Sequence, residues 1–367
     1  MGYRYLMNSD PVDVPAVPLP APLRALPPAP PAGRATMRDV AALAGVSLKT
    51  VSRVVNGATT VDAGLAARVR RAVAQLNYRH NMTASNLRRG DRRSFMIGLM
   101  LEDVSNPYSS AIYRAVEDVA RERGVELLAG SLGEDPDRER ELAASLVARR
   151  VDGLIIVPAG RDHSYLRDEQ DMGVAVVFVD RPPVLLPADS VMADGRHGAT
   201  TAVTHLIEHG HRRIAFLGDL TSIATAQERY AGYRGTLRSA GLPEDPALVL
   251  HDLHTAEAAE AAVIRLLSGP EPPSALFSSQ NLITIGTVRA LRACAAHHRT
   301  ALVGFDDVPL ADMLDPPVTV VAQDVVKVGT LAAQILFRRI DGDTSAVQAH
   351  IVPVRLIPRG SGEIPAP

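Results

Sequence analysis

From Phe95 onward, short apolar runs alternate with amphipathic stretches long enough to be helices. This alternation predicts an α/β fold, because strands that alternate with helices form parallel sheets covered on both faces. The runs that we expect to be strands are Met96–Leu101, Val125–Leu128, Leu154–Val157, Val174–Val179, Ile214–Leu217, Ala275–Phe277, Ala301–Phe305 and Val318–Val321. The expected helices are Ser109–Arg123, Arg138–Arg149, Gly195–His209, Tyr230–Ala240, Ala256–Leu267 and Asn281–Ala295.

The number of expected strands is too large for a single sheet. About 270 residues of this alternation predict more than about ten strands, so we expect two doubly wound parallel sheets in two lobes. Ligands of such folds bind at the carboxyl ends of strands, which here predicts a cleft between the lobes. The 367 residues also suit two or three domains better than one.

The segment before this region predicts three short helices. Thr36 is suited to begin the first helix and Gly45 to end it. The second follows Ser47 and ends at Asn56, and Asp62 opens a third with an apolar face. Two short helices around a glycine-containing turn, followed by a supporting helix, predict an all-α helix-turn-helix unit.

Charge separates this unit from the rest of the chain. Residues 36–93 hold ten Arg and one Lys against three Asp, a net charge of +8, whereas residues 94–367 carry −11. A small basic unit joined to a large acidic one predicts a polyanionic partner for the basic unit alone. For a helix-turn-helix unit, that partner is double-stranded DNA.

Other classes of protein are disfavoured by what the sequence lacks. No run approaches the eighteen apolar residues of a membrane span, and the opening MGYRYLMNSD has no secretory signal pattern. The single cysteine, Cys294, excludes a disulfide framework and a cysteine zinc site. We therefore expect a cytoplasmic protein. Residues 1–35 contain nine prolines, and we expect them to form a disordered tail.

Residues 36–57, TMRDVAALAGVSLKTVSRVVNG, resemble the DNA-binding headpiece of the lactose-repressor (LacI/GalR) family. Later segments fit the same family in the same order, as far as residue 362. They include Ile97-Gly98, Asn106-Pro107-Tyr108, Val151-Asp152-Gly153, Gly210-His211-Arg212-Arg213-Ile214, Val303-Gly304-Phe305-Asp306-Asp307 and Arg359-Gly360-Ser361. The resemblance implies a transcription repressor that binds a pseudopalindromic operator and a small-molecule effector.

The resemblance also implies the domain organisation. Residues 36–80 would form the helix-turn-helix domain, and residues 81–94 a hinge helix with its linker. A two-lobed effector domain, like the periplasmic binding proteins, would follow and would need no cofactor. Its first lobe would consist of residues 95–192 and 324–351, and its second lobe of residues 193–323 and 352–362.

The start of the second helix of a helix-turn-helix unit enters the major groove, where base edges differ in hydrogen-bonding pattern. Leu48, Lys49 and Arg53 occupy that part of the helix, and the resemblance implies that they read bases. Other residues would bind phosphates and position the unit without reading sequence. These residues are Ser47, Thr50, Ser52 and Asn56, and Arg38 is also expected to bind DNA.

Residues 81–90, NMTASNLRRG, match the family's hinge helix, which orders on the operator. The resemblance implies that Leu87 wedges between base pairs in the minor groove and that Ala84 packs beside it. Asn81 opens the match. His80 stands where the family usually has proline, which leaves the entry to the hinge less rigid.

The resemblance implies an effector site with residues from both lobes. The candidates are Asp103, Tyr108, Asp180 and Val325 from the first lobe, and Arg229, Gln280 and Asp306 from the second. A buried guanidinium among carboxylates and amides suits a ligand rich in hydroxyls, so we expect a sugar or sugar phosphate. A purine fits less well, because purine-binding relatives use two successive aromatic residues and here Ser109 follows Tyr108.

We expect a homodimer, because one small headpiece buries too little surface for tight, specific binding. Two alternatives stay open: a regulator whose corepressor is a nucleobase or another metabolite, and a solute-binding protein without DNA-binding function. An enzyme is not expected, since neither a phosphate-binding loop nor a nucleophile elbow is present. His205 and His209 have helical metal-ligand spacing but lack the carboxylate of a zinc protease, so we expect no metal.

Overall fold

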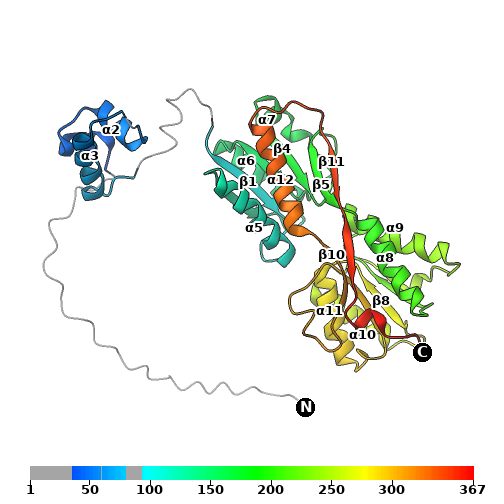
Figure 1. Cartoon of the computed structure of the whole chain (residues 1–367). Coiled ribbons are helices and arrows are strands. Elements are labelled where there is room, and N and C mark those ends of the chain that lie inside the picture. The colour runs from blue at the N-terminus through cyan, green and yellow to red at the C-terminus, as the bar shows by residue number, and fades with distance from the viewer. Residues whose placement is uncertain (1–34, 59, 80–92) are drawn as a thin grey trace, which may run out of the picture. The chain divides into compact units, whose positions relative to one another are not determined.

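The computed structural model describes residues 35–58, 60–79 and 93–367. The chain forms two units, one on each side of residues 84 and 85, and Figure 1 labels their elements. The predicted tail, apart from Ala35, and most of the predicted hinge lie outside the described residues, as do Asn81, Ala84 and Leu87. None of the described helices is both long enough and apolar enough to cross a bilayer.

The first unit contains three helices, α1 (Met37–Ala44), α2 (Leu48–Val55) and α3 (Ala63–Gln75). The predicted helix starts are confirmed: Thr36, Ser47 and Asp62 each accept a hydrogen bond from a backbone amide in the first turn. These bonds satisfy amides that a helix start leaves unpaired. Gly45 ends α1 with a φ of 60°, which favours glycine.

A small apolar core joins these helices. Val40, Val51 and Val69, one from each helix, are fully buried against one another. Arg68 of α3 adds a polar contact, because its guanidinium donates to the carbonyl oxygen of Ala44 at 2.7 Å. The third helix therefore fixes the turn between the first two, and the predicted helix-turn-helix unit is confirmed.

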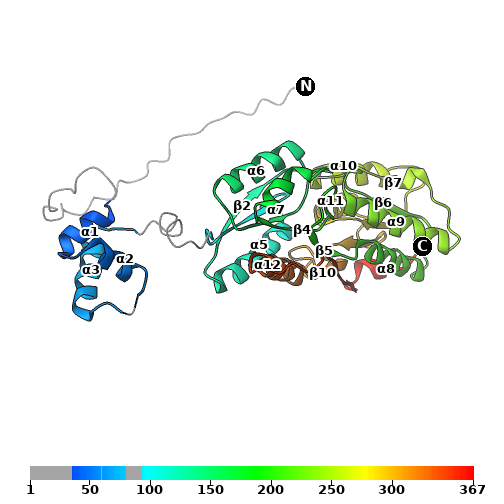
Figure 2. The ribbon, with the colours of Figure 1, turned by 90° about the horizontal axis from the view of Figure 1, so that it is seen from above.

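The second unit contains two six-stranded sheets with the same strand order (Figures 1 and 2). In the first lobe the order is β11-β5-β4-β3-β1-β2, and all pairs are parallel. Its strands are β1 (Met96–Leu101), β2 (Glu126–Ser131), β3 (Gly153–Ile156), β4 (Ala175–Val179), β5 (Asp189–Ala193) and β11 (Ala349–Val352).

The second lobe has the order β12-β10-β9-β8-β6-β7. Its strands are β6 (Ile214–Leu217), β7 (Val249–Leu250), β8 (Ala275–Ser278), β9 (Ala301–Phe305), β10 (Thr319–Gln323) and β12 (Val354–Ile357). The prediction of two wholly parallel sheets is wrong for β12, which runs antiparallel to β10. Only Pro353 separates β12 from β11, so the chain has no helical crossover that could reverse its direction.

Helices cover both faces of both sheets (Figures 1 and 2). In the first lobe α5 (Pro107–Glu122) and α12 (Val325–Ile340) cover one face, and α6 (Pro136–Ala148) with the short α7 (Arg167–Asp171) covers the other. In the second lobe the covering pairs are α8 (Gly195–Glu208) with α9 (Ala224–Ser239), and α10 (Ala256–Leu267) with α11 (Asn281–Ala293).

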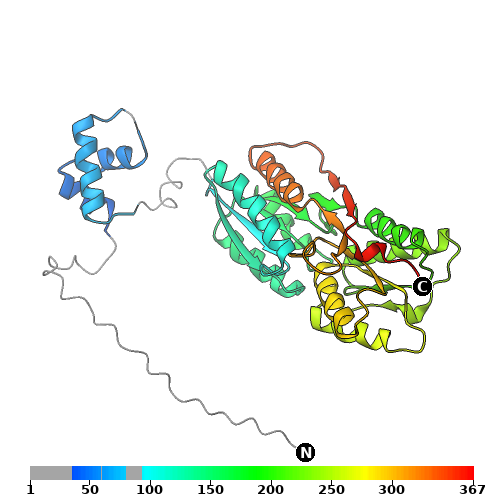
Figure 3. The same cartoon turned by 60° about the horizontal axis from the view of Figure 1, so that its bottom comes forward.

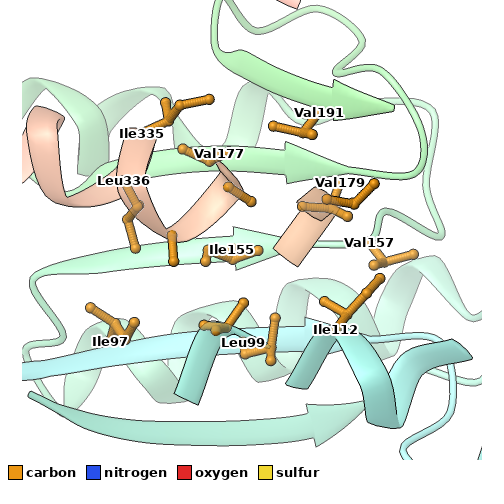
Figure 4. Packing of buried hydrophobic residues seen from close by; sticks show 14 of the residues in the cluster. Ile97, Leu99, Ile112, Ile155, Val157, Val177, Val179, Val191, Ile335 and Leu336 are labelled. Atoms are coloured by element: carbon orange, nitrogen blue, oxygen red, sulfur yellow. The ribbon is translucent and has the colours of Figure 1, made fainter. Parts of the chain in front are cut away.

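The strands are apolar on both faces because both faces are buried. In Figure 4 the side chains of Ile97, Leu99 and Ile155 lie with those of Val177 in one layer under α5 and α12. Phe178, the next residue along β4, belongs to the layer on the opposite face. Successive strand residues point to opposite faces, and this explains why these strands appear in the sequence as continuous apolar runs.

The chain passes between the lobes three times. It leaves β5 for α8 through Asp194, returns from β10 to α12 through Asp324, and crosses again at Pro353. Asp194 and Asp324 have the same ψ of 75°, and each accepts a backbone hydrogen bond from the helix that follows. The two lobes are thus joined by three short connections, with matching caps at two of them.

The C-terminal segment runs back along α8 (Figure 3). The imidazole of His205 lies 2.5 Å from a carboxylate oxygen of Glu363, and that of His211 lies 2.8 Å from the carbonyl oxygen of Ile364. The backbone amide of Ala366 donates to the carbonyl oxygen of His209. These histidines therefore anchor the end of the chain to the second lobe.

Candidate functional site

The candidate DNA interface is the exposed side of α2. Leu48 is 42% exposed at the start of the helix, an unusual position for a leucine, and Lys49 is exposed beside it. Arg53 is exposed one turn later, and its guanidinium donates to the hydroxyl of Thr60. The opposite side of α2 carries the buried Val51, so burial separates the structural face from the candidate base-reading face.

The residues that we predicted to bind phosphate have contacts of their own. Ser47 accepts a hydrogen bond from the amide of Thr50 at 3.1 Å, and their hydroxyls lie 2.9 Å apart. The side-chain amide of Asn56 donates a hydrogen bond to the backbone carbonyl oxygen of Ser52 at 2.7 Å. Arg38 is exposed on α1. Ser47 and Asn56 therefore stabilise the two ends of α2, and a contact with DNA remains a prediction for all five residues.

Two aspartates hold equivalent places at the second candidate site, where the two lobes meet. Asp180 directly follows β4 and Asp306 directly follows β9, and these strands have the same position in their sheets. Both residues have a positive φ, 68° and 70°, which is uncommon for a residue with a side chain. Each backbone amide bonds to the next strand, at Val191 and Val321 respectively. Each lobe thus contributes one carboxylate from an aspartate whose backbone conformation is strained.

Each carboxylate accepts a hydrogen bond within its own lobe, and one longer contact joins the two pairs across the lobes. The hydroxyl of Tyr108, on α5, donates to Asp180 at 3.1 Å. The side-chain amide of Gln323, at the end of β10, donates a hydrogen bond to Asp306 at 2.5 Å. The oxygen of the same side-chain amide lies 3.5 Å from the hydroxyl of Tyr108. Burial raises the pKa of Tyr108 and that of Asp306. The positive charge of the nearby Arg229 partly offsets the rise for Asp306. The structure thus brings four predicted residues of both lobes together.

Arg229 extends from α9 into this group and is 6% exposed. Its guanidinium carbon lies 3.9 Å above the centre of the Phe305 ring, and one terminal nitrogen donates to the carbonyl oxygen of Ser279 at 2.6 Å. Its Nε has no hydrogen-bond partner among the described residues, and neither has the buried hydroxyl of Ser279. Leaving such groups unpaired is costly, so these two atoms are suited to hydrogen-bond a ligand.

A further cluster lies at the same meeting of the lobes, and sequence reasoning missed most of it. His254 bonds Asp219 at 2.7 Å within the second lobe and lies 3.5 Å from Glu102 of the first. The predicted residue Gln280 joins this cluster, since its amide lies 3.4 Å from Asp219. Each carboxylate follows a predicted strand, Glu102 directly after β1 and Asp219 two residues after β6. That position after a strand was the available signal.

The missed cluster shifts the titration of its own members. Burial, and then the neighbouring Glu134, raises the pKa of Glu102 to about 7. The hydrogen bond that His254 donates to Asp219 raises the pKa of His254. Glu134 is itself engaged by Arg181, which bonds both of its carboxylate oxygens at 2.5 and 2.6 Å.

Two predicted effector residues have local contacts instead. Asp103 accepts hydrogen bonds from the amide and the hydroxyl of Ser105, and these bonds lower its pKa. Val325 packs against the core of the first lobe. Among the described residues, neither forms a hydrogen bond or ion pair with the group around Arg229 and Asp306.

The two lobes are in direct contact. The side-chain amide of Asn281 donates to that of Asn106 at 2.6 Å, and Arg161 donates to the carbonyl oxygen of Ser222 at 2.8 Å. Both bonds join the first lobe to the second. These bonds hold the lobes together, and we call the group of Tyr108, Asp180, Arg229, Asp306 and Gln323 the interlobe site.

Comparisons with known proteins match both units. The family model for bacterial regulatory proteins of the lacI family matches residues 36–81, and a model for a periplasmic binding protein-like domain matches residues 203–362. The ribose operon repressor of Escherichia coli (strain K12) is 31% identical over 89% of this chain and 99% of its own length.

Solved structures show similarity over the same length. The transcriptional regulator CelR–cellobiose complex is 30% identical, with a TM-score of 0.65, over 89% of this chain and all of that one. The lac repressor dimer bound to operator and the anti-inducer ONPF is 27% identical, with a TM-score of 0.78, over 90% of this chain and 99% of that one. On this sequence identity, coverage and shared domain order, the chain belongs to the lacI family of bacterial regulatory proteins and is a DNA-binding regulator of transcription.

Proposed function

We propose that this chain is a dimeric repressor that binds a palindromic operator and dissociates from it when a sugar binds between the lobes. One observation carries the proposal: the same chain has a recognition helix with exposed base-reading candidates and an interlobe site with buried, unpaired polar atoms. The first feature is suited to bind DNA, and the second is suited to bind a small ligand rich in hydroxyls.

The sugar is supported by both chemistry and similarity. Carboxylates such as Asp180 and Asp306 accept hydrogen bonds from ligand hydroxyls, and Arg229 donates them. Relatives carry the names ribose operon repressor and CelR, the latter in complex with cellobiose. The nucleobase corepressor remains the alternative, and a nucleobase that tightens operator binding would favour it. This proposed function implies a cytoplasmic protein that acts by binding rather than by catalysis.

Three short connections between the lobes suit a change in their relative position, since few residues must adjust. We propose that a bound sugar changes this position and that residues 81–94, with Leu87 as the minor-groove wedge, transmit the change to the DNA. These roles follow from the family resemblance.

The first experiment selects operator sequences with the purified full-length chain and measures binding by fluorescence anisotropy. Two chains should bind each palindrome in sedimentation, as the lac repressor does in its dimeric operator complex. Affinity should fall steeply with salt, with a slope that corresponds to about six to ten phosphates. One chain on a complete operator would contradict the proposed dimer.

A further inference from the structure

The charges around the interlobe site distinguish among ligands that all carry hydroxyls. Five carboxylates from the two lobes lie at it or are linked to it, among the described residues, by hydrogen bonds, ion pairs and electrostatic interactions. They are Glu102, Glu134, Asp180, Asp219 and Asp306. The basic groups of the same network are Arg181, Arg229 and His254. Acidic groups thus outnumber basic ones.

The basic groups are also engaged already. Arg181 bonds both oxygens of Glu134, and its Nε lies 3.4 Å from Asp180. His254 holds Asp219 on one side and faces Glu102 on the other. A phosphate that recruited either group would leave the half-buried Glu134 or Asp219 without its partner, which costs free energy.

Arg229 is the remaining basic group, and its surroundings suit hydroxyls better than phosphate. The Phe305 ring covers one face of its guanidinium. The carbonyl oxygen of Ser279 accepts a hydrogen bond from one of its terminal nitrogens. The unpaired Nε can donate one further hydrogen bond, and the unpaired Ser279 hydroxyl can donate or accept one. Single bonds of this kind match the hydroxyls of a sugar, whereas phosphate prefers a free guanidinium fork.

The helix starts at this site are occupied as well. A helix start is the usual backbone site for a phosphate. At the start of α5 the Asn106 side chain accepts the amide of Tyr108, and at the start of α11 the Gln280 side chain accepts the amide of Leu282. Arg161 reaches across the lobes, but it is exposed and donates to the carbonyl oxygen of Ser222.

We infer that the effector is an uncharged sugar and that the acidic network excludes phosphorylated sugars and sugar acids. This inference rests on the proposed sugar-dependent function and narrows it to one class. A second anion would add to repulsion that the site already contains: after burial, Glu134 helps to raise the pKa of Glu102 to about 7, and Asp180 contributes to the raised pKa of Asp306. A bound phosphate would have to add to this repulsion or take up protons with these groups. Their surplus therefore selects against sugar phosphates, while the hydroxyl contacts of a neutral sugar remain available.

The test measures matched ligand pairs with the full-length chain by isothermal titration calorimetry. The pairs are D-ribose with D-ribose 5-phosphate, D-glucose with D-glucose 6-phosphate, and D-fructose with D-fructose 6-phosphate, and cellobiose is added as a neutral disaccharide. We expect at least one neutral sugar to bind, with its phosphate weaker by about tenfold or more. A phosphorylated sugar that binds as tightly as its neutral counterpart would overturn the inference.

Two variants test the cause. At about pH 8, above the raised pKa of Glu102, Glu102→Gln removes one charged carboxylate of the network and should reduce the discrimination between the members of a pair severalfold. Glu141→Gln removes an exposed carboxylate of α6 and should not. An unchanged ratio in Glu102→Gln would contradict the electrostatic cause. If no sugar binds while operator binding is intact, the proposed function fails, and the inference fails with it. Binding of phosphates alone would retain sugar dependence and refute only the neutral class.

Discussion

At the scale of single residues, arginines of the basic N-terminal unit have different surroundings although the sequence presents them alike. Arg68 is committed to the turn of the helix-turn-helix, through the carbonyl oxygens of Ala44 and Gly45. Arg53 is exposed, and Thr60 is its only side-chain hydrogen-bond partner among the described residues. The net charge of the segment thus combines arginines that hold the fold with arginines that are free to reach DNA.

Replacing Arg53 by Ala should remove sequence preference while weak, salt-sensitive binding persists. A lost bidentate base contact costs about 1–3 kcal/mol per half-site, and a dimer loses two. Anisotropy titrations with the selected operator and a scrambled duplex measure the preference. Arg70→Ala, which removes an exposed charge of α3, is the matched control and should preserve the preference. Equal discrimination by Arg53→Ala and wild type would refute the assignment of the recognition helix.

At the scale of elements, periodicity predicted most of the fold. The predicted helix 256–267 coincides with α10, and the predicted strands 96–101 and 301–305 coincide with β1 and β9. One missed element has a sequence that hides its period. Strand β5 begins with buried polar residues, and its Asp189 is paired with Arg339 of α12. Helix α12 was not predicted either, although Lys327, Gln334 and Arg338 are exposed on one side of it at helical spacing.

The sequence predicted more of the candidate DNA interface than of the interlobe site. The headpiece is local in sequence, and its caps and spacing are therefore visible in one short segment. The interlobe site is assembled from strand ends far apart in the chain, and the resemblance supplied Tyr108, Asp180, Arg229 and Asp306. It did not supply the cluster around His254, because the approach of His254 to Glu102 across the lobes depends on a packing that sequence spacing does not encode.

Close helix packing in the second lobe makes a second prediction. A Cβ at Gly286 of α11 would lie 2.1 Å from the backbone carbonyl oxygen of Ala256 in α10. Gly286→Ala should therefore push these helices apart and lower the free energy of unfolding by about 1–3 kcal/mol. Gly235→Ala in α9 is the control, since a Cβ there meets nothing within 4 Å. It should raise stability by up to about 1 kcal/mol. Denaturant unfolding measures both, and a neutral Gly286→Ala would contradict this packing.

At the scale of the whole molecule, the two lobes are held together by few connections and by titratable contacts. Glu102 of the first lobe, whose pKa is raised to about 7, faces His254 and Asp219 of the second, with Glu134 and Arg181 beside it. A carboxyl group with a raised pKa in the fold contributes stability at pH values below its unfolded pKa, and that contribution is lost as pH rises through the folded value. The raised pKa of His254 has the same sign.

The stability of wild type should therefore fall relative to that of Glu102→Gln as the pH rises from about 4.5 to about 7. Thermal unfolding across this range measures the difference, because the Gln side chain does not titrate. Glu141→Gln should follow the wild-type curve. Parallel curves for wild type and Glu102→Gln would show that ionisation of Glu102 does not oppose folding.

The central claim is that a sugar bound between the lobes controls the affinity for DNA, and operator titration with and without sugar tests it most directly. Wild type should lose about 5- to 150-fold in operator affinity when a neutral sugar saturates it. Arg229→Ala, and the nearly isosteric Asp306→Asn, should bind the operator like wild type without sugar and should not respond to it. Wild-type affinity that rises with sugar or stays unchanged, or variants that release the operator as wild type does, would contradict the claim.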